Sequence, residues 1–310
     1  MASEGSTRAV VTALGANLMI GVSKFIAAAI TGSASMLAEG VHSVADSANQ
    51  VLLLIGGRRA RRPASALHPF GYARERYVYA FLVAVVLFSL GGLYALYEGY
   101  HKVLDPHPLE SPLVAVLVLF IAAALEGYAL RTAVGEANRT RNGRGWLGFV
   151  RRTRSPELPV ILLEDSGALL GLLFALIGVG LSVLTGNGIF DGISTLCIGA
   201  LLGTVAVLLA VETKSLIIGE SAVPEQLAAI EAALLAAPGV DRVIHLRTVH
   251  LGPDELLLTA KIGVGANEHG ADIAATIDDA EARVRSAVPT AKVIYLEPDI
   301  YRPDTASAAP

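Results

Sequence analysis

The residues best able to do chemistry in this sequence lie within one apolar stretch, Ser35–Gln50, and are spaced for one face of a helix. His42 and Asp46 are four residues apart, which is one helical turn, so their side chains project from the same face. Glu39 precedes His42 by three residues and Asn49 follows Asp46 by three, which continues the polar stripe in both directions. An imidazole and a carboxylate one turn apart can occupy neighbouring positions on one divalent cation.

The apolar setting of this stripe restricts what it can be. Polar side chains buried in lipid without partners cost several kcal/mol, so the stripe indicates a bundle interior, a water-filled cavity or a bound ion. The alternative is a hydrogen-bonded seam between packed helices, and the sequence leaves both interpretations open.

The composition favours an integral membrane protein. Of 310 residues, 53% are apolar and only 17% are charged, and the mean hydropathy is +0.57. The net charge of -4 provides no basic excess for following phosphates, which argues against nucleic acid as a partner. A single cysteine, Cys197, excludes an internal disulfide framework and a cysteine-based metal cluster.

Six stretches are long enough to cross a bilayer, which needs about 20 apolar residues. They cover residues 9–31, 35–57, 77–99, 112–134, 159–184 and 190–218. We expect the first to be a membrane helix rather than a removed signal. The loops after the second and fourth stretches are rich in Arg, whereas the three opposite loops hold one clear cation, Lys102. The positive-inside rule therefore places both Arg-rich loops and both termini in the cytosol.

Beyond Gly219 the charges are spaced through the chain, and the pattern predicts a small α+β domain. We expect helices over residues 224–237 and 272–288, and strands over residues 240–249, 255–264 and 292–296. This order predicts an antiparallel sheet covered by two helices on one face. The predicted division is a transmembrane domain over 1–218, a cytosolic α+β domain over 219–301 and a disordered tail over 302–310.

Taken together, these features resemble the cation diffusion facilitator family over nearly the whole chain. The stretches that carry the resemblance are Thr31–Glu39, His42-Ser-Val-Ala-Asp46 with Asn49 and Gln50, His68-Pro-Phe-Gly-Tyr72 leading to Arg74-Glu-Arg-Tyr77, and Leu162–Gly171. His-Pro-Phe-Gly-Tyr and Leu-Leu-Glu-Asp-Ser are most similar to the branch that contains the zinc transporter nine of animal mitochondria. The resemblance implies homodimeric transporters, with a ferredoxin-like cytosolic domain for dimerisation, that move Zn2+ and similar ions out of the cytosol against H+ entry.

Carried over by position, the resemblance implies that His42 and Asp46 are the metal ligands of the second helix. Asp165 matches the carboxylate ligand of the fifth helix. Ile161 stands where many members place a further His or Asp, which leaves three obvious ligands. Glu164 is the nearest substitute, but neighbours on a helix point about 100° apart. Glu164 therefore contacts the ion through a local distortion, relays protons or faces another helix.

Two further metal sites known in the family are incomplete here. His68 matches one ligand of a loop site, but Ser65 and Tyr72 occupy the other positions, so we expect His68 to be a turn residue. In the tail the matching positions are mostly apolar or aromatic, and only Glu297 can bind metal. We therefore expect the tail to dimerise by packing, with little or no metal of its own.

Together with these residues, the resemblance implies a secondary transporter, not an enzyme, that exports divalent cations by alternating access in exchange for protons. One imidazole and two carboxylates suit Zn2+, and Mn2+, Co2+ or Fe2+ also fit. The ligands must lose protons to bind metal, which links the affinity for the ion to pH. The expected partners are the ion, H+, the bilayer and a second copy of the chain, with no permanently bound cofactor. Abundant Ala, Gly and Arg favour a bacterial inner membrane.

Other functional classes remain open. A membrane-anchored metal sensor or scaffold would bind the ion without moving it, and a channel would pass it downhill without protons. An intramembrane enzyme is disfavoured, because no nucleophile with a paired base and no His-Glu-x-x-His motif is visible. Asp191, at the start of the sixth stretch, either lines the exit path or caps its own helix.

Overall fold

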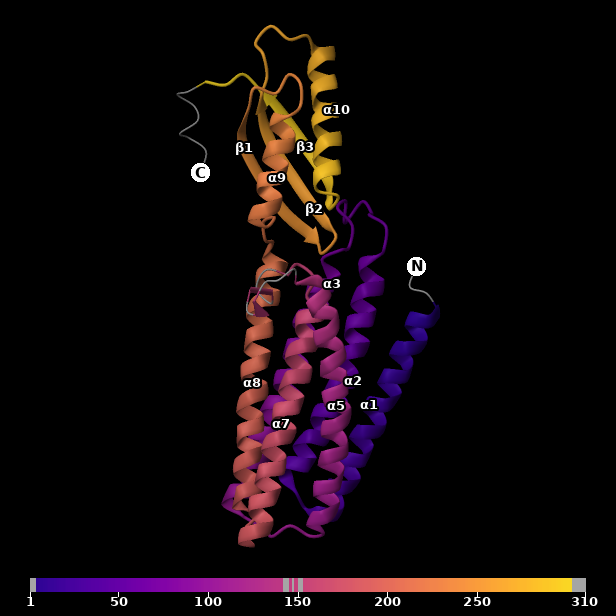
Figure 1. The fold of residues 1–310 in the computed structure, drawn as a ribbon, viewed down its shortest axis with the longest axis vertical. Coiled ribbons are helices and arrows are strands. Elements are labelled where there is room, and N and C mark those ends of the chain that lie inside the picture. The colour runs from indigo at the N-terminus through magenta and orange to yellow at the C-terminus, as the bar shows by residue number, and fades with distance from the viewer. Residues whose placement is uncertain (1–3, 142–144, 147, 150–152, 303–310) are drawn as a thin grey trace. The chain divides into compact units, whose positions relative to one another are not determined.

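The structure is a computed structural model that describes residues 4–141, 145–146, 148–149 and 153–302 (Figure 1). The chain divides into two compact units, which are taken separately. The first consists of Met1–Ala60 and Glu75–Lys214, and the second of Arg61–Arg74 and Ser215–Pro310.

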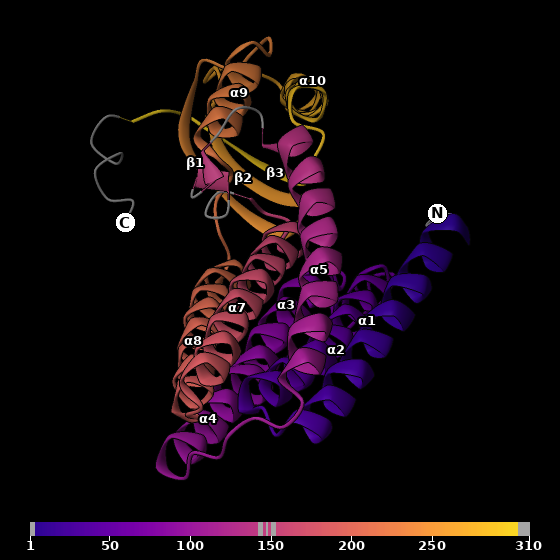
Figure 2. The ribbon, with the colours of Figure 1, turned by 60° about the horizontal axis from the view of Figure 1, so that its bottom comes forward.

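The first unit is a bundle of long helices that lie side by side (Figures 1 and 2). Its helices are α1 (Glu4–Thr31), α2 (Ala34–Ala60), α5 (Pro112–Thr140), α7 (Glu157–Thr185) and α8 (Ile189–Ile218), the last of which ends beyond the unit. Between α2 and α5 runs a stretch made of α3 (Glu75–Val86), the π-helical segment η1 (Leu87–Leu93) and α4 (Tyr94–Leu104). Each of the six predicted apolar stretches falls inside one of these helical segments.

The breaks between the helices follow from local sequence. Gly32, with φ of 63°, ends α1, and Gly186, with φ of 68°, ends α7. Glycine suits both positions because it adopts positive φ without a steric penalty. Pro112 occupies the first turn of α5, where a helix does not need its missing N–H.

Four helical stretches are long and apolar enough to cross a membrane among the residues described, namely Glu75–Leu104, Pro112–Arg139, Glu157–Thr185 and Ile189–Ile218. The predicted count of six spans is therefore not confirmed. The described side chains of α1 begin at Asn17 and form a shorter apolar helix, Asn17–Thr31. α2 is 27 residues long but carries the polar stripe, which lowers its apolar character.

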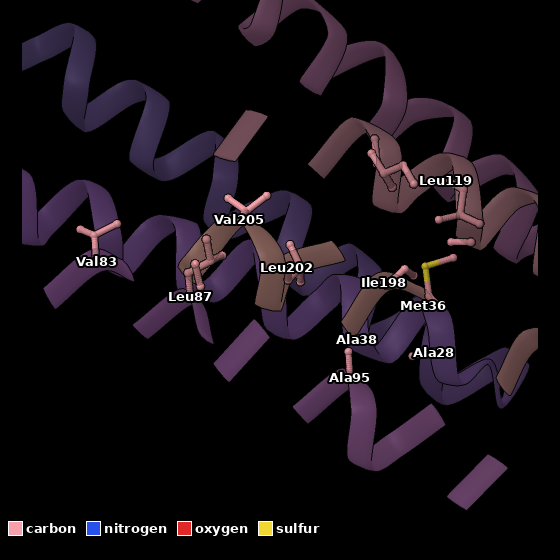
Figure 3. Packing of buried hydrophobic residues seen from close by; sticks show 14 of the residues in the cluster. Ala28, Met36, Ala38, Val83, Leu87, Ala95, Leu119, Ile198, Leu202 and Val205 are labelled. Carbon is pink, nitrogen blue, oxygen red and sulfur yellow. The ribbon is translucent and has the colours of Figure 1, made fainter. Parts of the chain in front are cut away.

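Apolar side chains fill the interior of the bundle and also cover much of its outer surface. Figure 3 shows Met36 of α2, Leu87 of η1 and Leu202 of α8 among the buried residues. On α5, Leu113 is 83% exposed and Leu117 is 62% exposed. Large apolar side chains exposed in this number suit a lipid environment rather than water.

The second unit is an α+β domain, as predicted. Its elements are α9 (Pro224–Leu235), β1 (Arg242–Gly252), β2 (Glu255–Gly263), α10 (Gly270–Ala287) and β3 (Ala291–Asp299). The strand order is β1-β2-β3, with β2 antiparallel to β1 but parallel to β3. The prediction of an antiparallel sheet is therefore wrong for β3. Because α10 lies between β2 and β3 as a crossover, it returns the chain to the same end of the sheet, which makes the two strands parallel.

One face of this sheet carries the core of the second unit. Along β2 the buried residues alternate with partly exposed ones, as they do when one face of a strand is covered. α9 and α10 pack against each other and against the flanking strands (Figure 2). The buried side chains of this cluster include Ile230, Leu234, Leu256, Leu258, Ile262, Ala280 and Val284.

Candidate metal centre

α2 brings His42 and Asp46 together as the spacing predicts. His42 Nε2 lies 3.5 Å from Asp46 Oδ2, and the two side chains are 1% and 15% exposed. The pair is therefore inside the bundle, and its imidazole and carboxylate are adjacent.

Several atoms of the polar stripe have no hydrogen-bond partner in the described part of the chain. They are both ring nitrogens of His42, Oδ1 of Asp46, Oδ1 of Asn49, Oε1 of Gln50 and Oε1 of Glu39, all of them buried. Buried polar atoms are rarely left without a partner, so such a group calls for an explanation. Unpaired ring nitrogens and carboxylate oxygens are also the atoms that bind divalent metal ions.

The other two predicted residues, Glu164 and Asp165, belong to α7. α2 and α7 are in contact. Glu164 is 7% exposed, and its Oε1 accepts a hydrogen bond from Asn49 Nδ2 of α2. Asp165 is half-buried and interacts electrostatically with Asp46 and Glu164. Three of the four predicted residues, Asp46, Glu164 and Asp165, thus interact electrostatically between these helices, and His42 lies beside Asp46.

The four side chains do not form a closed set of ligands in this conformation. Within the described ranges, no three His, Cys, Asp or Glu side chains lie close enough to hold a metal ion. Glu164 bonds to Asn49, whereas Asp46 faces His42. The different surroundings of Glu164 and Asp165 agree with the angle between neighbouring residues on a helix. Whether these residues are the metal ligands stays a prediction.

Two charged residues near this region were missed by the sequence analysis. Lys24 of α1 is fully buried and contacts Glu39. Glu126 of α5 is half-buried and acts electrostatically on His42 and Asp46 of α2, as well as on both acidic residues of α7. The sequence contained a signal for both residues, because an ionisable residue inside an otherwise apolar span is a functional candidate by default.

The π-helical segment η1 also lies beside the stripe. A Cβ added at Gly91 would be 3.7 Å from His42 Nδ1. π-helical turns occur often at functional sites, because the extra residue changes the direction of neighbouring side chains. Here glycine leaves space next to the imidazole.

Asp191 lies in the first turn of α8, but the helix that it caps is α2 rather than its own. Its carboxylate accepts hydrogen bonds from the backbone N–H of Ala34, at 2.6 Å, and of Ser35, at 3.3 Å. The hydroxyls of Ser33 and Ser35 donate to the same carboxylate. A carboxylate at a helix N-terminus satisfies free N–H groups and the helix dipole. Asp191 thus joins α8 to α2, and the alternative that its side chain caps its own helix is wrong.

At the two incomplete family sites, the candidate ligands His68 and Glu297 make hydrogen bonds or ion pairs with other residues of the protein. His68 and Ser65 exchange backbone hydrogen bonds of 3.1 Å, which confirms that His68 is a turn residue. The Ser65 hydroxyl also lies 3.1 Å from the Tyr72 hydroxyl. In the second unit, Glu297 forms an ion pair of 3.0 Å with Lys261.

Comparison with known proteins identifies relatives over both units. The cation efflux transmembrane domain matches residues 10–218, and the cytoplasmic domain of cation efflux proteins matches residues 222–299. The human "Proton-coupled zinc antiporter SLC30A9, mitochondrial" is 34% identical over 241 residues, which cover 77% of this chain and 42% of that protein. "Metal tolerance protein C4" of Arabidopsis thaliana is 31% identical over 259 residues, or 83% of this chain and 57% of that protein. The chain therefore spans about half the length of these relatives.

A solved structure also matches part of the chain. The structure named MamM-CTD 215-293 is 21% identical, covers 25% of this chain and 96% of that chain, and has a TM-score of 0.24.

Proposed function

This chain belongs to the cation diffusion facilitator family of cation efflux proteins, and from that premise we propose that it exports Zn2+ from the cytosol in exchange for protons. It is a multi-pass membrane protein and a transporter rather than an enzyme. The name of the human relative, a proton-coupled zinc antiporter, supports both the ion and the coupling.

The observation that carries the proposal is the buried pair of His42 and Asp46. Both ring nitrogens and one carboxylate oxygen of this pair are buried without a hydrogen-bond partner among the described residues. In a membrane such groups are costly without a partner, and they commonly mark ion or proton paths. A divalent cation that arrives from the cytosol could bind these buried atoms without displacing a hydrogen-bond partner among the described residues.

In the proposed site, His42, Asp46 and Asp165 bind the ion and Glu164 supplies a further carboxylate. Because Asn49 donates to Oε1 of Glu164, Glu164 would bind the ion through its other oxygen or after this hydrogen bond opens. His42 and the carboxylates must be deprotonated to bind, so protons and metal compete for the same atoms. Protons that enter from the far side would displace the ion, and they would leave again on the cytosolic side.

Alternating access requires one group of helices to move against another around a site within the membrane. The proposed site lies between α2 and α7, so a change in their separation would open or close it. We propose that residues 1–218 form the transport domain and that residues 219–301 form the cytosolic domain, which pairs with a second copy. The match to a cytoplasmic domain of cation efflux proteins supports the second assignment. The human relative is named as mitochondrial, which does not support the bacterial inner membrane expected from composition.

The experiment is Zn2+ flux into proteoliposomes under an imposed pH gradient. Wild type is compared with Asp46→Ala and Asp165→Ala, and Asp105→Ala serves as the matched control, because the Asp105 side chain is 80% exposed. We expect flux that follows the gradient in wild type and the control, and a loss of at least about tenfold in both site variants. Repeating the series with Mn2+, Co2+ and Fe2+ ranks the ions.

Each contrary result identifies another function. Zn2+ binding without flux at any gradient would support the metal sensor. Flux that runs downhill and ignores the pH gradient would support a channel. Flux that survives both site variants would place the ion path elsewhere.

A further inference from the structure

Lys24 holds a positive charge inside the helix bundle. Its side chain is fully buried, and Nζ lies 3.1 Å from Glu39 Oε2. Nζ also donates a hydrogen bond of 2.9 Å to the Ser43 hydroxyl. Both partners belong to α2, so the ammonium ties α1 to the polar stripe.

The sequence of α1 directs Lys24 inward. Val22 and Ile26, two residues to either side, are 57% and 56% exposed. Two residues correspond to about 200° of rotation on a helix, so Lys24 lies on the opposite face. A buried ammonium is costly unless it is paired and hydrogen-bonded, and both conditions are met here.

Glu39 is confined from the other side by α7. A Cβ added at Gly171 would lie 2.7 Å from Glu39 Oε1, so the absence of a side chain there makes room for the carboxylate. Oε1 itself has no hydrogen-bond partner in the described part of the chain. The pair of Lys24 and Glu39 is therefore enclosed by three helices, and one carboxylate oxygen remains unused.

This ion pair lies on the side of the proposed metal site toward the start of α2. Glu39 is three residues before His42 on the same helix, and the charges of Lys24 and Glu39 act on His42 and Asp46 with opposite signs. While the pair is intact, the two charges therefore oppose each other at the site.

We propose that Lys24 is an affinity-determining residue, a tethered cation that neutralises Glu39 and so keeps the His42–Asp46 site weak enough to release a divalent ion. The inference rests on the proposed function and deepens it. A transport site must bind well enough to load but not so well that the ion cannot leave. Without Lys24, the uncompensated carboxylate attracts a divalent cation, and this attraction is stronger in a protein interior than in water.

The test is the Zn2+ affinity of the purified full chain in detergent, measured by competition with a chromophoric chelator. We expect Lys24→Gln to bind Zn2+ at least about tenfold more tightly than wild type, and Glu39→Gln to bind at least about tenfold more weakly. The double variant, which removes both charges, should return to within about threefold of wild type. Lys24→Arg, which keeps the charge, should bind like wild type.

The two single variants are expected to shift the Zn2+ affinity in opposite directions, which distinguishes an electrostatic role from a purely structural one. If Lys24 and Glu39 only hold the helices together, both single variants weaken binding, and the inference is overturned. Should Lys24→Gln fail to fold, the double variant must still bind at least about tenfold more tightly than Glu39→Gln alone. Equal affinity of those two proteins would also overturn the inference.

Asp46→Ala distinguishes the two proposals. If Asp46→Ala keeps full Zn2+ affinity, the proposed metal site is wrong. If Asp46→Ala loses binding while the Lys24 and Glu39 variants do not shift in opposite directions, the site stands and the role of Lys24 fails.

Discussion

Asn49 Nδ2 donates a hydrogen bond to Glu164 Oε1, and this bond joins α2 to α7 inside the bundle. Both residues are buried, since Asn49 is 0% exposed and Glu164 is 7% exposed. Glu164 thus has a protein partner in the absence of an ion. A metal ion bound by Glu164 would replace this hydrogen bond or be held by the other carboxylate oxygen.

Glu164→Gln tests whether Glu164 binds the ion. The amide keeps the size of the side chain and can still accept a hydrogen bond from Asn49, but it loses the charge. We expect Zn2+ affinity to fall at least about tenfold, with a small change in melting temperature. Chelator competition and thermal unfolding in detergent measure the two effects. The control is Glu136→Gln, whose side chain is 57% exposed. Unchanged affinity would show that Glu164 is only a packing partner.

Asp191→Ala should destabilise the helix bundle. The substitution leaves two backbone N–H groups of α2 and two serine hydroxyls without their buried acceptor. We expect a loss of about 2–4 kcal/mol, and a smaller loss for Asp191→Asn, which keeps one carbonyl acceptor. Thermal unfolding in detergent measures both, with the exposed Asp105→Ala expected to change stability by less than about 0.5 kcal/mol. A wild-type melting temperature for Asp191→Ala would contradict the interhelical cap.

Substitution by alanine should change the stability of the protein differently at two glycines of α7. A Cβ at Gly178 would lie 2.5 Å from Ser194 Cβ and 3.0 Å from the carbonyl oxygen of Phe190, both on α8, whereas a Cβ at Gly180 meets no atom within 4 Å. We expect Gly178→Ala to cost about 1–3 kcal/mol because it forces α7 and α8 apart. Gly180→Ala should be neutral or stabilising by up to about 1 kcal/mol through helix propensity. Similar melting temperatures for both variants would refute this close packing.

The second unit contains a surface ion pair with a defined pH dependence. Hydrogen bonds from the Lys261 ammonium and then from the Ile300 backbone N–H lower the pKa of Asp299 below its usual 3.8. Hydrogen bonds to Glu297 and Asp299 raise the pKa of Lys261 above its usual 10.5.

Each pKa shift limits the pH range in which the pair contributes to the stability of the fold. The pKa of Asp299 is lower in the folded state than in the unfolded state. The stability that Asp299 contributes is therefore present above its unfolded-state pKa and is lost as pH falls through its folded-state pKa. The Lys261 contribution is present below its unfolded pKa and is lost as pH rises through the folded one. Lys261→Met should therefore lower the melting temperature slightly near neutral pH and less in strong acid. A difference from wild type that is constant with pH would contradict this assignment.

The sequence by itself determined the local features of this protein. Runs of apolar residues broken at Gly32, Gly186 and Pro112 predict the helices, because backbone conformation at these breaks depends on the residue itself. The four-residue spacing of His42 and Asp46 likewise places them together on any helix. The motifs around them predicted the family, which the matches over both units confirm.

The tertiary structure decided which distant groups meet. The sequence could not pair Asn49 with Glu164, Lys24 with Glu39 or Asp191 with the start of α2, since each contact joins two different helices. It also did not predict that β3 lies parallel to β2, which depends on the path of α10. The spacing of residues along one helix is a local property that the sequence fixes directly. The rotation and offset of one helix against another result from the packing of the whole bundle, and they decide which buried charges are paired.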